Sequence, residues 1–169
     1  MAEKKKLLKR SEVPLEYRWK IEDVYPNDEA WEEDFKQCKE MGQAIGTFRY
    51  TLNASPAQLR FFFEQQDKLG MLLDRVYLYA AMKKDEDNGN PHYAGMKDRV
   101  QNLAVSIEAA LSWVEPEILD IPVDTLNEWL KTPDLEPYRR AIELITRQRP
   151  YILSPAEERI IAQAGDFAS

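Results

Sequence analysis

The sequence predicts an all-α protein: a multi-helical array with a long antiparallel helical hairpin and an extended N-terminal leader. Three observations support this class. Apolar residues recur at spacings of three and four over most of the chain, which is the period of a helix with one buried face. A Ser-Pro-Ala sequence, typical of a helix start, occurs at Ser55 and again at Ser154. No segment predicts a strand with any strength.

The chain is expected to divide into residues 1–27, an extended leader that packs on the helices, and residues 28–169, a helical domain. Two prolines in the leader argue against one continuous helix, because proline lacks the N–H that an interior helical position needs. The leader is also too aromatic for a free tail. We expect Trp19 and Tyr25 to anchor it, and the lysine-rich start to be solvated.

The first helix is predicted to begin at Asn27 or Asp28 and to end near Gly46. Either residue can cap the helix, and the acidic residues that follow suit its positive N-terminal end. Spacings of three and four predict its buried face, which consists of Trp31, Phe35, Cys38, Met41 or Gly42, and Ile45.

The second helix is predicted to start at Ser55 and to be long. Ser55 can accept a hydrogen bond from the backbone N–H of Gln58, and the Gln58 side chain can reach back. The helix ends at the polar turn 87–91, from which a third helix runs towards Trp113, so the two form an antiparallel hairpin. Tyr77 and Tyr79 widen the apolar surface of the second helix, which we expect to be covered on more than one side.

Shorter helices are predicted in the remainder of the chain. Pro116 is expected to introduce a bend, Asp124 to cap a short helix, and residues 138–149 to form another one. A last helix starts at Ser154 and has barely begun where the sequence stops. We therefore expect the chain to be a piece of a longer protein.

Charge and composition exclude several classes of partner. The 30 acidic and 23 basic residues give a net charge of −7, which repels phosphate backbones and predicts no nucleic-acid binding. No apolar run approaches the roughly 20 residues that cross a bilayer, and none forms a signal peptide. Cys38 is the only cysteine, so no internal disulfide can form. These features predict a cytoplasmic protein without a membrane partner.

His92 is the only histidine, and this limits the chemistry that the chain can perform. A zinc-protease helix needs two histidines one turn apart with a glutamate beside the first, which His92 lacks. A serine or cysteine nucleophile would also need this imidazole as its base. We therefore predict no catalytic residue in this chain, and a surface position for His92 at a helix start.

The remaining candidates for chemistry have simpler explanations. Cys38 lies on a predicted apolar face and is expected to be a buried hydrophobe rather than a redox thiol. The acidic turn that begins at Asp85 has Asn90 and Met96 where a calcium loop requires glycine and glutamate. A second acidic group is expected to be solvated charge at a helix start, and consists of Asp28, Glu29, Glu32, Glu33 and Asp34. We predict no metal-binding and no cofactor-binding residue.

Several stretches resemble the N-terminal part of oligoendopeptidase F proteins, which belong to the thimet-oligopeptidase-like zinc metallopeptidases. They follow one another in the same order and separation along nearly the whole chain, at residues 10–14, 17–25, 29–32, 115–119, 135–138 and 153–159. The resemblance implies that the zinc-binding helix lies far downstream, in a catalytic domain that this chain does not contain. It implies that no zinc ligand or catalytic residue of the family falls on this chain.

The resemblance also implies a role. In the family, the N-terminal helical part forms one wall of a channel that admits short peptides and excludes folded proteins. The expected function is therefore a non-catalytic, channel-forming domain of an oligopeptide-cleaving zinc metalloendopeptidase. Its partners would be the catalytic domain, with its zinc, and short peptides. A free-standing helical interaction module is the alternative, and self-association through an uncovered apolar surface stays open.

Overall fold

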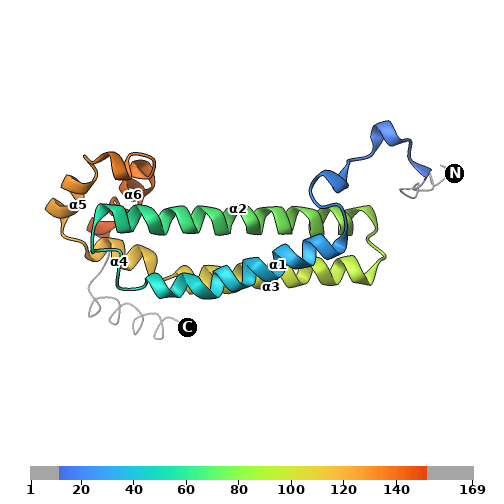
Figure 1. Ribbon diagram of the computed structural model, residues 1–169, viewed down its shortest axis with the longest axis horizontal. Helices are drawn as coiled ribbons and strands as arrows, with labels where there is room; N and C mark the ends of the chain where they lie inside the picture. Colours follow the sequence, from blue (N-terminus) through green and yellow to red (C-terminus); the bar gives the residue numbers. More distant parts are fainter. Residues whose placement is uncertain (1–11, 152–169) are drawn as a thin grey trace, which may run out of the picture. The chain divides into compact units, whose positions relative to one another are not determined.

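The computed structural model describes residues 12–151, and in this part of the chain every regular element is a helix or a 3-10 turn (Figure 1). The predicted all-α class is confirmed. The chain forms two compact units. Unit 1 consists of the described residues as far as Arg49 together with Phe62–Ser112, and unit 2 of Tyr50–Phe61 together with residues 113–151.

Unit 1 is built on three helices, α1 (Asp28–Ala44), α2 (Pro56–Glu86, from Phe62 onward) and α3 (Pro91–Leu111). The predicted hairpin is confirmed, since α2 and α3 run antiparallel and are joined by the turn 87–90 (Figure 1). Helix α1 lies beside α3 and runs parallel to it, and both run antiparallel to α2.

The start of α1 follows the predicted capping pattern. Asn27 adopts an extended backbone, and its side-chain Oδ1 accepts the N–H of Ala30 at 2.8 Å. This hydrogen bond satisfies one of the donors that a helix start leaves without an internal partner. The buried side of the helix includes Trp31, Cys38 and Gly42, as their spacing predicted.

Helix α2 begins as predicted but with only half of the reciprocal cap. The backbone N–H of Gln58 donates to Ser55 Oγ at 3.1 Å, and Pro56 occupies the first helical position, where its missing N–H has no helical partner to lose. The Gln58 side chain does not return to Ser55. Its Nε2 donates to Thr51 Oγ1 at 3.1 Å instead, which ties the helix start to the preceding loop.

The core of unit 1 gathers around Trp31 of α1. The indole Nε1 donates to the backbone carbonyl of Val76 in α2 at 2.8 Å, and the indole ring stacks on Phe35 at 5.2 Å between centroids. The buried residues packed in this cluster come from the leader and from all three helices, and are Ile21, Tyr25, Trp31, Val76, Tyr79, Ala80, Met96 and Val100. Burying a large apolar side chain stabilises a fold by roughly 1.5–3 kcal/mol, so this cluster contributes substantially to the stability of unit 1.

Only one of the two residues expected to anchor the leader does so. Tyr25 is 2% exposed, as predicted, but Trp19 is 73% exposed, so the prediction that Trp19 anchors the leader is wrong. Ile21 takes that role at 1% exposure, because the 3-10 turn η3 (Ile21–Asp23) directs it into the core. The Arg75 guanidinium donates to the carbonyl of Val24 at 2.9 and 3.2 Å and fixes the end of the leader on α2. The domain boundary at residue 27 stays a prediction.

Unit 2 is built from short elements: α4 (Val114–Asp120), α5 (Val123–Trp129), η5 (Pro133–Leu135), α6 (Arg139–Thr146) and η6 (Arg149–Tyr151). Pro116 lies inside the first turn of α4, where proline is tolerated, and the bend expected there stays a prediction. Asp124 does not cap α5, contrary to the prediction. The cap position is Pro122, without a side-chain hydrogen bond, and Asp124 lies in the first turn. The helix expected from Ser154 lies outside the described residues.

A single carboxylate fixes the loop that opens unit 2. Glu117 of α4 accepts the backbone N–H of Tyr50 at 2.7 Å through Oε2 and that of Leu52 at 2.8 Å through Oε1. Tyr50 has a φ of 68°, which is costly for a bulky residue, and no other non-glycine residue in the described range has a positive φ. Hydrogen bonds to a charged acceptor contribute about 1.5–3 kcal/mol, enough to offset the strain.

We predict opposite effects for two glycine-to-alanine substitutions in unit 1. In Gly42→Ala, the new Cβ would lie 2.7 Å from Cγ1 of the buried Ile107, so overpacking should lower the free energy of unfolding by about 1–3 kcal/mol. Gly70→Ala is the matched control in α2, since a Cβ there meets nothing within 4 Å. It should stabilise by up to about 1 kcal/mol through helix propensity. Denaturant unfolding measures the free energy of unfolding of both variants. An equal increase in the two would contradict the close contact between α1 and α3.

Candidate functional site

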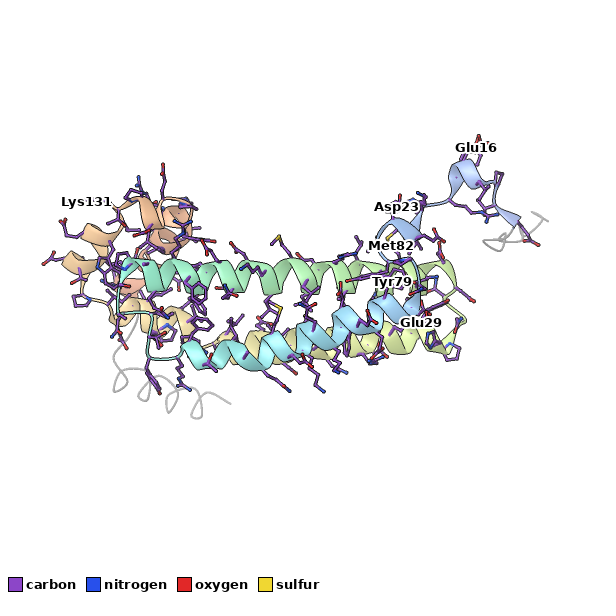
Figure 2. All side chains as sticks on the ribbon, viewed as in Figure 1. Glu16, Asp23, Glu29, Tyr79, Met82 and Lys131 are labelled. Carbon is purple, nitrogen blue, oxygen red and sulfur yellow. The ribbon has the colours of Figure 1, made fainter. Side chains whose placement is uncertain are left out.

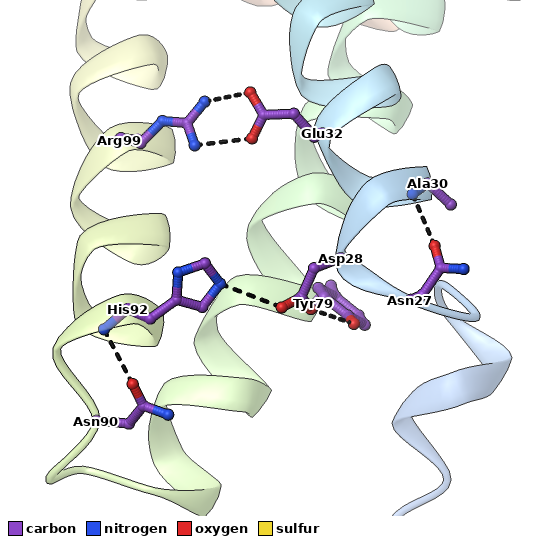
Figure 3. A network of polar contacts seen from close by, with 8 residues as sticks. All are labelled: Asn27, Asp28, Ala30, Glu32, Tyr79, Asn90, His92 and Arg99. Atoms are coloured by element: carbon purple, nitrogen blue, oxygen red, sulfur yellow. Dashed lines mark hydrogen bonds and ion pairs between the residues drawn. The ribbon is translucent and has the colours of Figure 1, made fainter.

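The described chain has its densest set of polar contacts at the N-terminal end of α1 (Figure 3). Asp28 links this end to both other helices of unit 1. Its Oδ1 accepts the hydroxyl of Tyr79 in α2 at 2.8 Å, and its Oδ2 lies 3.1 Å from Nε2 of His92 at the start of α3. Burial, followed by the hydrogen bond to Asp28, raises the pKa of Tyr79 well above its usual range, so the phenol stays protonated and donates.

One turn further along α1, Glu32 forms a two-pronged ion pair with Arg99 of α3. The two N–O distances are 2.6 and 2.8 Å (Figure 3). The Arg99 guanidinium also lies over the rings of Phe35, at 4.3 Å, and Trp31, at 5.3 Å. The hydrogen bonds from Arg99 lower the pKa of Glu32, and those to Glu32 raise the pKa of Arg99. Arginine is suited to this position because its planar fork pairs with a carboxylate and stacks on aromatic rings.

A third acidic residue of α1, Asp34, binds the end of the leader. Its Oδ2 accepts the hydroxyl of Tyr25 at 2.7 Å and lies 3.6 Å from Nη1 of Arg75. The Arg75 guanidinium covers the Tyr25 ring at 4.4 Å. Burial and then the hydrogen bond to Asp34 raise the pKa of Tyr25 well above its usual range. The leader, α1 and α2 therefore meet in one polar cluster.

These contacts correct the interpretation of three of the five acidic residues as solvated charge, whereas Glu29 and Glu33 are exposed, as predicted. Asp28, Glu32 and Asp34 are each bound to a side chain of another element, and the distances are those of specific hydrogen bonds. Sequence reasoning missed these pairs because their partners lie 9 to 67 residues away along the chain. A weak signal was present: the three acids recur at spacings of four and two on a helix whose apolar face was already assigned.

Two other candidates are placed as predicted. The His92 side chain is 62% exposed at the start of α3, where its backbone N–H donates to the capping Asn90 at 3.0 Å. Cys38 is completely buried, and burial raises the pKa of its thiol to about 11. A thiol with this pKa is almost entirely protonated near neutral pH and makes a poor nucleophile.

The polar turn between α2 and α3 has the form of a connection rather than an ion site. Asp87 Oδ1 accepts the N–H of Gly89 at 3.2 Å, which is the local bonding of a turn. Within residues 12–151, no group of three or more His, Cys, Asp or Glu side chains is placed to hold a metal ion. In the same range, no helix is both long and apolar enough to span a membrane.

Comparison with known proteins identifies the class to which this fold belongs. Residues 117–169 match a family model described as Oligopeptidase F. Oligopeptidase PepF of Bacillus subtilis is 39% identical over 170 residues, which cover 98% of this chain and 25% of that protein. Group B oligopeptidase PepB of Streptococcus agalactiae is 29% identical over 94% of this chain and 26% of its own length.

Two crystal structures share the fold. A peptidase from Chlamydophila abortus superposes with a TM-score of 0.81 at 25% identity, over 94% of this chain and 27% of its own. Oligoendopeptidase-F from Enterococcus faecium superposes with a TM-score of 0.64 at 30% identity, over 83% of this chain and 28% of its own.

The resemblance to oligoendopeptidase F proteins is confirmed: this chain is similar to an N-terminal part of these peptidases in both sequence and fold. It spans about a quarter of the length of the curated relatives that it matches.

The Glu32–Arg99 pair makes a specific contribution to the pH dependence of stability. The pKa of Glu32 is lowered in the folded state, so the pair stabilises the fold above the ordinary glutamate pKa of about 4.3 and is lost as pH falls through the lowered value. Both side chains are about half exposed, which limits the expected contribution to about 1 kcal/mol at most.

The free energy of unfolding should fall between neutral pH and a pH of about 3, and it should fall by less in Arg99→Met than in the wild type. Urea unfolding at several pH values measures this difference. Arg140→Met is the matched control, because Arg140 pairs with Glu143 at 3.5 Å on an exposed helix face of unit 2. Identical pH profiles for wild type and Arg99→Met would contradict the role of this pair.

Proposed function

We propose that this chain is the N-terminal, non-catalytic domain of an oligopeptide-cleaving zinc metalloendopeptidase, and that it forms one wall of the channel through which short peptides reach the zinc. The observation that carries the proposal is the extent of the sequence match. The likeness runs over 98% of this chain but over only 25% of its Bacillus subtilis relative. The catalytic residues and the zinc would then belong to the remaining part of the longer protein.

Exposed apolar side chains on α2 support the proposal that this helix faces other parts of a longer protein. Met71 and Leu78 lie seven residues apart, on one side of the helix, and both are exposed. Val105 of α3 is also exposed. Tyr79 is not part of this surface, because it is 1% exposed, whereas Tyr77 and its neighbour Leu78 are exposed. The proposal requires that these exposed apolar side chains be covered in the longer protein, as a contiguous apolar patch would be.

The remaining parts of the proposal concern location and partners. The longer protein would act in the cytoplasm, with its catalytic domain and short peptides as partners and without nucleic acid or membrane. In the absence of the catalytic domain, this chain would form a homo-oligomer through the exposed apolar side chains of α2. A free-standing helical interaction module is the alternative function. The encoding gene separates the two: an in-frame zinc motif of the His-Glu-x-x-His type beyond Ser169 supports the first, and a stop codon there rules it out.

We expect the chain alone to have no peptidase activity. The purified 169-residue chain with added zinc should not cleave an internally quenched short peptide above the buffer rate, because His92 is its only imidazole and its 62% exposed side chain lies beside Asp28 and Tyr93. The full-length Bacillus subtilis relative is the positive control. Cleavage that copurifies with the chain through several columns, and that a chelator abolishes, would contradict the proposal.

Thiol labelling tests whether the α2 surface is covered in the longer protein. In Met71→Cys, the new thiol should react readily in the isolated chain, because Met71 is 66% exposed. Cys38 is an internal control that should stay unlabelled until unfolding, because it is fully buried and its pKa is raised to about 11. The Met71→Cys thiol should react much more slowly in the longer protein. Equal rates in the two would contradict the assignment of this face as a wall.

A further inference from the structure

Unit 1 also contains a pocket that lies apart from the polar network of α1. It is a pocket of about 390 Å³ between the described part of the leader and the C-terminal end of α2. Met82 of α2 lines it, beside the turn that contains Asp23 (Figure 2). The other lining residues that matter here are the aromatic Tyr17 and Trp19 of the leader and the acidic Asp85 and Glu86 of α2.

The aromatic side of the pocket is unusual for a folded leader. Tyr17 and Trp19 line the pocket and yet are 72% and 73% exposed. Large aromatic rings stabilise a fold most when buried, so these two contribute little to the core that Ile21 and Tyr25 occupy. Exposed aromatic faces at the edge of a pocket are typical of ligand-binding surfaces.

The charged side of the pocket is acidic. Asp85 and Glu86 bring two carboxylates, and Arg18 brings one guanidinium. The Arg18 Nε donates to the backbone carbonyl of Val13 at 2.6 Å, which holds this cation against the leader. Lys84 Nζ lies 3.7 Å from Asp85 Oδ1, and the Asp85 side chain of this pair is 69% exposed, so the contact contributes little energy. The excess of carboxylates, in a chain of net charge −7, favours a cation and repels an anion.

We propose that this pocket binds a basic side chain, lysine or arginine, carried by a peptide. The aliphatic stem of the side chain would lie against Met82, its cationic head over the Trp19 or Tyr17 ring, and its charge towards Asp85. Aromatic faces and carboxylates together are the usual means of recognising an organic cation. This site needs neither the channel nor the catalytic domain, so it stands apart from the proposed function.

The test is an NMR titration of the ¹⁵N-labelled 169-residue chain, with the indole N–H of Trp19 as the reporter. Trp19→Phe assigns that resonance among the four tryptophans. The probe is acetyl-Gly-Lys-Gly-amide, and it should shift the Trp19 signal saturably. The same peptide with norleucine keeps the stem and removes the charge, and the version with glutamate reverses it. Both should bind several-fold more weakly, since a cation–π contact at an exposed site contributes about 0.5–1 kcal/mol.

Two variants locate the charge and the ring. Asp85→Asn should weaken binding of the lysine peptide about two- to fivefold, whereas Asp74→Asn, an exposed acid on the same helix outside the pocket, should not. Trp19→Ala, followed through shifts of the Met82 methyl group, should lose binding while its unfolding midpoint stays unchanged, because the ring is exposed.

Three results would overturn the proposal. Equal affinity for the lysine and norleucine peptides would remove the cation as the recognised group. An equal effect of Asp85→Asn and Asp74→Asn would show that general charge rather than the pocket attracts the peptide. Binding of n-butylamine as tightly as the lysine peptide would show a free amine, and not a peptide, to be the ligand. None of these results depends on whether the gene continues beyond Ser169.

Discussion

The hydrogen bond from the Trp31 indole to the Val76 carbonyl is the interaction on which unit 1 depends. It joins α1 to the middle of α2, at a carbonyl whose second lone pair can accept while the first serves the helix. The indole is 1% exposed, so the bond forms in a region of low dielectric, where an unpaired N–H would cost about 1–3 kcal/mol. Phe35 stacks on the ring, and Arg99 of α3 covers it. One side chain therefore brings all three helices into contact.

The acidic residues of α1 add direction to this apolar packing. Hydrophobic contacts alone permit helices to slide or rotate, because apolar burial is not directional. Hydrogen bonds to Asp28, Glu32 and Asp34 require particular distances and angles, and each ties α1 to a different partner element or position. Asp28 also lies in the first turn of α1, where a negative charge interacts favourably with the positive end of the helix dipole. Charge at a helix start thus serves both the helix itself and its placement.

The sequence predicted what local chemistry determines and missed what the tertiary fold determines. The caps at Asn27 and Ser55 were predictable because a capping side chain bonds within three residues. The anchoring of the leader was not, since Trp19 and Ile21 are both apolar and only the η3 turn selects which one is buried. The polar partners of Asp28 were also hidden, because contacts across 51 and 64 residues leave no periodic signal. Nor did any local pattern show that residues 50–61 pack with the chain after residue 112.

The parallel course of α1 and α3 has a consequence for how this domain can vary in length. Their contacts at Asp28, Glu32 and Gly42 all join residues separated by 64 to 67 positions, so the two helices share one register over most of α1. Adding or removing one residue within α1 would rotate the following part of the helix by about 100° and shift it by about 1.5 Å along its axis. The side chains of that part could then no longer make their contacts with α3. The turn 87–90 is under no such restriction. Length variation among related proteins should therefore collect in the turns and spare α1.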